Sequence, residues 1–300
     1  MNIYSIRNDR LQVDISSCGA EVQSIYDFLS RTEYLWQGDA RWWVERSPLL
    51  FPIIGRLRND VYSHEGQTYS MESPHGFIKS KIFQPVSVKT DSICLQVTST
   101  PETLAQYPFT FRFSVEYKLV ESALIFSFLI QNEHDRLMPF SLGTHPGFNV
   151  PLASGETFDG YSLAFECEEN PYRVDLDGVL LAGKMSPFAL QSNRFLPLRH
   201  RLFDHEAIIL GGIQKKSVSL VDSVGITRWS MHFDDFDYLT LWLPEHTDAP
   251  FVCLECWNGL PDPADANTNA LDQKPGTRIL APGDTAGFSL RICFKAFAGE

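Results

Sequence analysis

Strict alternation of apolar and polar residues is the feature that most constrains how this chain folds. In "TFRFSVEYKL" (110–119) every second side chain is large and apolar, namely Phe111, Phe113, Val115 and Tyr117. Successive side chains of a strand point to opposite faces, so these four share one face of a sheet. The segment "ALIFSFLIQN" follows after the turn residues Glu121-Ser122. The two segments therefore predict a β-hairpin.

The same period of two recurs along most of the chain, in "LQVDIS", "SICLQVTS", "KSVSLVD", "DYLTLWLP" and "FVCLEC". Only "TPETLAQYP" favours a helix, with Thr100 as its cap and Pro101 at its first position. The 19 glycines and 18 prolines are spread as turn residues, and no change in composition marks a linker. These patterns predict an all-β protein, a large antiparallel β-sandwich, with residues 1–300 as a single domain.

The charge of the chain limits its partners. It has 37 Asp and Glu against 25 Lys and Arg, a net charge of −12. Nucleic acids and anionic membrane surfaces attract basic proteins, so we expect neither as a partner. The chain lacks an apolar run of about 18 residues and an N-terminal signal sequence, which favours a cytoplasmic location. A small neutral molecule, or an anion bound by a local arginine cluster, fits this charge better.

The cysteine and histidine spacings give no support to a disulfide framework or a metal site. Six cysteines are scattered along the sequence, as expected of reduced thiols: Cys18, Cys94, Cys167, Cys253, Cys256 and Cys293. Cys253 and Cys256 have redox-motif spacing, but "FVCLECW" predicts a strand, whereas a redox motif opens a helix. The histidines show neither HxH nor HExxH spacing, so we expect no metal.

Two residues have the chemistry of an acid–base pair. His145 ends an alternating run in "FSLGTHPGFN", where Pro146 favours an extended backbone and Gly147 allows an abrupt turn. Such a turn would display an imidazole, able to act as a general acid near neutral pH, at the edge of a sheet. Glu255 stands in the apolar run "FVCLECW", where an unpaired carboxylate is costly to bury. The alternatives are a turn with a polar tip and a glutamate paired with an arginine.

Further polar residues at predicted strand ends are candidates for binding. Arg56 and Arg58 in "GRLRND" would point to one face if the backbone is extended, and arginines suit hydroxyl pairs, carboxylates and phosphates. His75 lies between a proline and a glycine, and Asp204 precedes the apolar run "AIIL". Trp257 would offer an exposed indole as a platform for a sugar. The alternatives are solvent-facing arginines, a structural histidine and an aspartate in an Asx turn.

Five segments, taken in order, resemble the aldose 1-epimerase (galactose mutarotase-like) family, most closely its bacterial mutarotase-like branch. They are "SPLLFPIIGRL", "HGF", "THPGFN", "FDHEAIIL" and "CLECWNGLPD". The resemblance spans nearly the whole chain. It implies the supersandwich of galactose mutarotase-like proteins, with a sugar cleft on a concave sheet. It also implies an isomerase that interconverts the anomers of a hexose without a cofactor. His145 would protonate the ring oxygen, and Glu255 would take the proton of the C1 hydroxyl.

The resemblance implies binding roles for the other candidates. His75 would hydrogen-bond the sugar, Asp204 would hold ring hydroxyls, and Arg56, with help from Arg58, would support the substrate. The chain departs from the family pattern at Cys256, where the residue after the glutamate is usually proline. The arginine spacing in "GRLRND" is also shorter than in well-studied galactose mutarotases.

Three other functions remain open from sequence. A hexose-6-phosphate 1-epimerase would bind the phosphate with Arg56, Arg58 or Lys79. A non-catalytic sugar-binding or sensing module would share the sandwich but has no need of an acid–base pair. A glycosidase would require a second carboxylate near Glu255. The partner in each case is a small sugar or sugar phosphate, and the chain would be a monomer or a homodimer.

Overall fold

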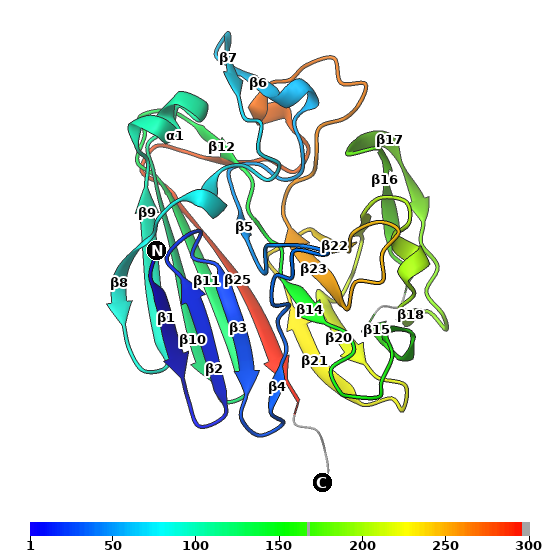
Figure 1. The fold of residues 1–300 in the computed structure, drawn as a ribbon. Coiled ribbons are helices and arrows are strands. Elements are labelled where there is room, and N and C mark those ends of the chain that lie inside the picture. The colour runs from blue at the N-terminus through cyan, green and yellow to red at the C-terminus, as the bar shows by residue number, and fades with distance from the viewer. Residues whose placement is uncertain (167–168, 296–300) are drawn as a thin grey trace.

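Two large antiparallel sheets pack face to face in the computed structural model, which describes residues 1–166 and 169–295 (Figure 1). The first sheet has nine strands, in the order β18 (Phe195–Pro197), β15 (Ser162–Phe165), β20 (Ser217–Val221), β21 (Thr227–His232), β25 (Thr285–Phe294), β11 (Ala123–Asn132), β10 (Phe111–Val120), β9 (Ser92–Thr98) and β8 (Gln84–Val88). The second has eight, with β17 (Leu180–Pro187), β16 (Tyr172–Asp177), β19 (Ile208–Gly211), β22 (Tyr238–Trp242), β23 (Phe251–Trp257), β13 (Gly143–Thr144) and β5 (Leu49–Leu50) in order, and β14 (Gly147–Asn149) also paired with β23.

Smaller elements complete the described structure. A four-stranded sheet contains β1 (Ile3–Arg7), β2 (Leu11–Ser16), β3 (Val22–Asp27) and β4 (Thr32–Glu33). Two strand pairs are β6 (Val61–His64) with β7 (Gln67–Ser70), and β12 (Met138–Phe140) with β24 (Arg278–Leu280). The helical elements are α1 (Pro101–Gln106) and the 3₁₀ turns η1 (Arg58–Asp60), η2 (Ile78–Ser80), η3 (Phe158–Gly160), η4 (His200–Phe203) and η5 (Leu271–Gln273). The prediction of an antiparallel β-sandwich is confirmed.

Local sequence signals explain several of these elements. The four alternating side chains of β10 are all fully buried, and β10 pairs with β11 through the predicted hairpin. Helix α1 starts as predicted, because the Thr100 hydroxyl accepts a hydrogen bond from the Thr103 N–H. Among the described residues, no helix is long and apolar enough to cross a membrane.

The main core lies between the sheets. Phe113 of β10 packs on Phe51 with ring centroids 5.4 Å apart, and Trp229 of β21 packs on Phe148 of β14 at 4.3 Å. Farther along the same face of β10, the Tyr117 hydroxyl donates to the carbonyl of Ala20, in the turn between β2 and β3. One face of the nine-stranded sheet is therefore covered by the eight-stranded sheet and the four-stranded sheet. Figure 1 shows the strands β1–β3 of the four-stranded sheet in front of β10 and β11.

The opposite face of the eight-stranded sheet carries a separate apolar cluster that includes Leu50, Ile209 and Trp257. Cys256 points the other way, into the main core, where its thiol approaches the sulfur of Met231. Burial raises the pKa of both Cys253 and Cys256, so neither thiol is reactive. The five cysteines that the structure describes are free, as expected, and Cys167 lies outside the described residues.

Candidate functional site

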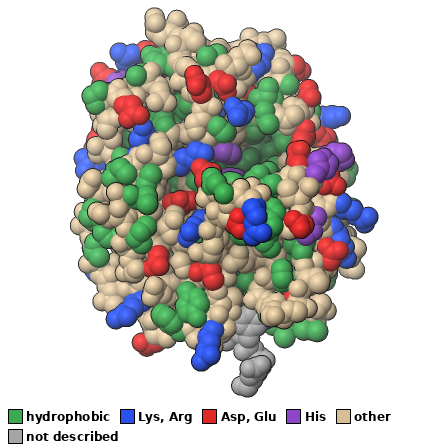
Figure 2. Space-filling model, in the orientation of Figure 1, with side chains coloured by type: hydrophobic (Ala, Val, Ile, Leu, Met, Phe, Trp, Pro, Cys, Tyr) green, Lys and Arg blue, Asp and Glu red, His purple; other side chains and the backbone are tan. Residues whose placement is uncertain are grey.

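A cavity of about 420 Å³ opens on the outer face of the eight-stranded sheet. Figure 2 shows the hollow, with histidine side chains inside it and both cationic and acidic side chains at its edge. Strands β22 and β23 form its floor, and the segments around Trp43, Arg56 and Glu206 form its walls. Of the residues singled out from sequence, His75, His145, Glu255, Trp257, Arg56 and Lys79 line this cavity. A cavity of this size, mainly apolar with a few convergent polar groups, is typical of a small-molecule site.

His145 lies between β13 and β14, and the backbone keeps the same course past Pro146. Strand β13 pairs with β23 at Gly143 and Trp257, and β14 pairs with it at Gly147 and Cys253, in one unbroken register. The expectation of an abrupt turn here is wrong. Proline removes one backbone donor, but the chain stays extended because the pairing with β23 resumes at once.

This register places His145 directly across from Glu255. Side chains at opposed positions of antiparallel strands lie on the same face, with Cβ atoms about 4.5–5.5 Å apart. The Leu254 N–H donates to the Pro146 carbonyl at 3.1 Å, which fixes the two strands at this point. Residues 110 positions apart in sequence thus become neighbours through backbone pairing alone.

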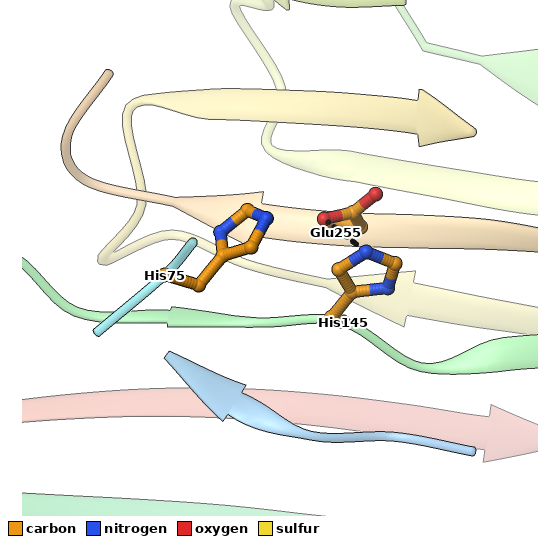
Figure 3. A group of neighbouring side chains, drawn as sticks. All are labelled: His75, His145 and Glu255. Carbon is orange, nitrogen blue, oxygen red and sulfur yellow. Dashed lines mark ion pairs between the residues drawn. The ribbon is translucent and has the colours of Figure 1, made fainter. Parts of the chain in front are cut away.

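The two side chains meet inside the cavity (Figure 3). His145 Nε2 lies 3.2 Å from Glu255 Oε2, and their side chains are only 11% and 2% exposed. Within the described part of the chain, Glu255 Oε2 has no contact of hydrogen-bond geometry besides this ion pair, and His145 Nδ1 has no partner outside its own backbone. Buried polar atoms are nearly always fully bonded, so the spare bonding capacity of the pair points to a ligand.

Burial shifts both groups towards their neutral forms. Burial is the main cause that lowers the pKa of His145 to about 3; a hydrogen bond to the backbone of His145 opposes this shift, and the nearby Lys79 charge adds to it. Burial raises the pKa of Glu255 well above its usual range, an effect that the Trp257 side chain partly opposes. Near neutral pH the pair therefore holds one proton between its two members. Transfer of that proton from the carboxyl to the imidazole gives a base and an acid.

His75 is fixed as a hydrogen-bond donor. Its Nδ1 accepts the Gly55 N–H at 3.1 Å, so the proton of the neutral ring is on Nε2. Burial lowers the pKa of His75 well below its usual range, and the charge that His145 can carry lowers it further. The residue adopts φ 65°, and Gly76 follows with φ 76° against the Phe51 carbonyl. The nitrogens of both histidines and the Glu255 carboxylate lie within 4.8 Å of one another, but in this tautomer His75 donates a proton rather than a lone pair.

The two arginines separate. Arg56 lines the cavity, and its guanidinium lies 3.3 Å from Asp60 Oδ1. Arg58 is not among the lining residues, so the expectation that both share one face is wrong. The backbone leaves the extended conformation at η1, where Asn59 has φ 59°, and the Arg58 N–H is held by Asp262 Oδ2 at 2.9 Å.

Asp262 also forms a buried ion pair. Its Oδ1 lies 3.0 Å from Lys274 Nζ, with side chains 8% and 2% exposed. Its backbone N–H donates to the Arg56 carbonyl at 3.0 Å. Burial lowers the pKa of Lys274 to about 8, although the Asp262 charge opposes this shift. The ion pair fixes Asp262, and Asp262 in turn fixes the backbone of the cavity wall at Arg56.

Asp204 does not line the cavity, contrary to the role expected for it. It ends η4 in helical conformation and contacts His246 Nδ1 at 3.3 Å. Two residues later Glu206 adopts φ 65°, which turns the chain so that Glu206 lines the cavity instead. Glu245 lies beside it and accepts the Glu206 N–H at 3.1 Å. The carboxylates on this wall come from Glu206 and Glu245.

Trp257 lines the cavity but is only 4% exposed, so it forms part of a wall rather than an exposed platform. Sequence reasoning missed Trp43 and Trp242, which line the same end of the cavity. Trp43 stacks on His145 with centroids 4.9 Å apart. The segment "ARWWVERS" has no periodic pattern, and its paired tryptophans in polar surroundings are the one signal that marks it.

Comparisons with known proteins agree with this architecture. The family model for aldose 1-epimerase matches residues 2–293. Protein LacX, chromosomal, of Lactococcus lactis subsp. lactis is 33% identical over 295 residues, which cover 96% of this chain and 97% of that protein.

Two solved structures share the fold. A galactose mutarotase-like protein from Lactobacillus casei superposes with a TM-score of 0.92 at 31% identity, over 98% of this chain and 100% of that one. A galactose mutarotase related enzyme from Lactobacillus acidophilus superposes with a TM-score of 0.91 at 29% identity, over 98% and 97%. The chain therefore belongs to the aldose 1-epimerase family and has its galactose mutarotase-like β-sandwich fold.

Proposed function

We propose that this protein is an aldose 1-epimerase that interconverts the α and β anomers of a hexose by opening and closing the sugar ring. The observation that carries the proposal is the buried His145–Glu255 pair, with 3.2 Å between Nε2 and Oε2 and one proton shared near neutral pH. Ring opening removes a proton from the C1 hydroxyl and adds a proton to the ring oxygen, so it needs a base and an acid close to each other. A module that only binds sugar does not.

The proposed steps balance in protons. The Glu255 carboxylate takes the proton of the C1 hydroxyl while the protonated His145 gives its proton to the ring oxygen, and the C1–O5 bond breaks. The C1–C2 bond of the free aldehyde rotates, and the ring closes with the roles reversed. Each turnover leaves the pair with the same single proton, so no cofactor is required.

The remaining lining residues would bind and orient the sugar. His75 Nε2–H, fixed by the Gly55 N–H, is placed to donate to a sugar oxygen beside the pair. Arg56 offers further donors, and the carboxylates of Glu206 and Glu245 can accept from ring hydroxyls. Trp257 supplies an apolar wall for the C–H face of the ring.

The charges around the cavity favour an unphosphorylated sugar over a hexose 6-phosphate. Each lining cation already faces a carboxylate, Arg56 at 3.3 Å from Asp60 and Lys79 at 3.0 Å from Glu45. The wall at Glu206 and Glu245 adds two further negative charges. A phosphate dianion would have to displace these carboxylates to reach a cation.

We also propose that residues 1–300 act as one domain, as a monomer or homodimer, in the cytoplasm. A contiguous core that joins the three larger sheets supports one domain, and the five described free thiols suit a reducing compartment.

The direct test follows a pure anomer to equilibrium by polarimetry or NMR, for a panel of hexoses and their 6-phosphates. We expect at least one hexose to equilibrate faster than in buffer alone. Glu255→Gln should lower this rate about 10²–10⁴-fold, since it removes the base but keeps the shape of a neutral side chain. The matched control is Glu121→Gln, in the β10–β11 turn far from the cavity. If no sugar equilibrates faster than in buffer, or if Glu255→Gln retains the full rate, the proposal is wrong.

A further inference from the structure

His145 lacks the support that usually orients an acid–base histidine. Such rings are normally held by a hydrogen bond from Nδ1–H to a carboxylate or a carbonyl. Here Nδ1 is buried and, among residues 1–166 and 169–295, has no hydrogen-bond partner outside the backbone of His145 itself. The contact of Nε2 with Glu255 is made by the reacting atoms themselves and would change during turnover.

Aromatic packing surrounds the imidazole instead. Trp43 lies against its face, with centroids 4.9 Å apart and planes at 30°. Trp242 meets it edge to face, with 5.6 Å between centroids and planes at 77°. The two indoles also pack on each other in T-shaped geometry at 5.6 Å. A ring in contact with two fixed aromatic side chains has little freedom to rotate about its Cβ–Cγ bond.

Trp43 is itself fixed, although it lies outside any strand. Its backbone N–H donates to the Asp39 carbonyl at 3.1 Å, and its carbonyl accepts the Trp36 indole N–H at 2.8 Å. Gly147 leaves space for it, because a Cβ there would come within 3.2 Å of the Trp43 ring and 3.1 Å of Trp36 Cβ. The glycine after His145-Pro146 therefore has a packing role: it lets an indole reach the imidazole.

We infer that Trp43 is a positioning residue, which holds the His145 ring in the orientation that directs Nε2 at Glu255 and the sugar. The expected effect on kcat rests on the proposed function, but the fixed orientation of the His145 ring does not. Trp43 takes the place of a hydrogen bond from Nδ1 to a second residue, and it acts on the reaction through the imidazole.

The kinetic test compares three variants. Trp43→Leu removes the stacking surface, and a misplaced catalytic group costs about 10²-fold, so we expect kcat to fall by about that factor with little change in KM. Trp43→Phe keeps a flat ring and should recover most of kcat. The matched control is Trp42→Leu, because the Trp42 side chain bonds Asp248 and does not contact His145. Thermal unfolding of each variant shows that it is folded.

The second test needs no activity. NMR of histidine labelled with ¹³C follows the titration of the His145 ring. The ionisable groups that face it are Glu255 on β23, His75 before η2, and Lys79 with its partner Glu45. None of these is altered in Trp43→Leu, which admits water to the ring. We therefore expect the pKa of His145 to rise by about one unit or more from its value of about 3.

The outcomes separate the two proposals. The positioning role is supported if kcat falls in Trp43→Leu and recovers in Trp43→Phe, and if the pKa of His145 rises in Trp43→Leu. An increase in KM alone overturns it and makes Trp43 a wall for the substrate. An unchanged His145 titration also overturns it. If the wild-type protein equilibrates no sugar, the proposed function fails, and the titration still decides the role of Trp43.

Discussion

The burial of His145 should make the stability of this fold depend strongly on acid pH. Its pKa is about 3 in the folded protein, against about 6.5 in an unfolded chain. Between these values the unfolded chain binds a proton that the folded protein does not. The contribution to stability is therefore complete above pH 6.5 and is lost as the pH falls towards 3. A pH of 4.5 is two pH units below 6.5, which corresponds to a loss of about 3 kcal/mol in the free energy of unfolding.

Urea unfolding of the wild type and of His145→Gln, each at pH 7.5 and pH 4.5, measures this loss. The free energy of unfolding should fall by about 3 kcal/mol more in the wild type than in the variant. Glu255 has a raised pKa and acts in the opposite direction, but it is present in both proteins, so its effect largely cancels in the difference. The same substitution at the exposed His205 serves as the control.

An equal loss of stability in wild type and His145→Gln would refute the reasoning. It would mean that the imidazole remains hydrated in the folded protein, and that the aromatic side chains around it do not exclude water. The proposed mechanism would then lose its account of how the pair holds one proton.

Four further substitutions test other parts of the site. Arg56→Ala should raise KM about tenfold, whereas Arg58→Ala should leave KM within about twofold, in steady-state assays with the preferred sugar, because only the first side chain lines the cavity. Asp262→Asn leaves the Lys274 charge buried without its partner and should lower the free energy of unfolding by about 3–5 kcal/mol in urea; an unchanged midpoint would contradict the buried ion pair. Gly147→Ala places a methyl group against the Trp43 ring and the β-carbon of Trp36, so it should lower the free energy of unfolding by about 1–3 kcal/mol and lower kcat; full activity would argue against the tight contact.

Local patterns predicted the elements that depend on local physics. The hairpin of β10 and β11 follows from side chains that alternate between core and exterior, and α1 follows from a threonine cap and a proline at its first position. Glu255 stood out because a carboxylate is costly to bury in an apolar strand, and His145 because an imidazole ends an alternating run before Pro146 and Gly147. Their cavity positions match the expectation, and their roles stay predictions until activity is measured.

The failures concern residues whose orientation depends on distant partners. Arg58 turns away because Asp262, 204 positions later, binds its backbone N–H. The chain at His145 stays extended because β23 pairs on both sides of Pro146. Trp43 reaches the imidazole from a segment without regular structure. No local propensity encodes such contacts, since they form only when the sheets assemble.

The shared register of β13, β14 and β23 has a consequence for the motions of the protein. Because backbone pairing sets His145 opposite Glu255, the backbones of the two residues separate only when this part of the ladder opens. The Leu254 amide is bonded to the Pro146 carbonyl at the centre of the ladder. Its hydrogen exchanges with solvent only through such openings. The exchange rate of one amide in deuterated water therefore reports how often the strands that carry the pair come apart, in the resting protein and without any substrate.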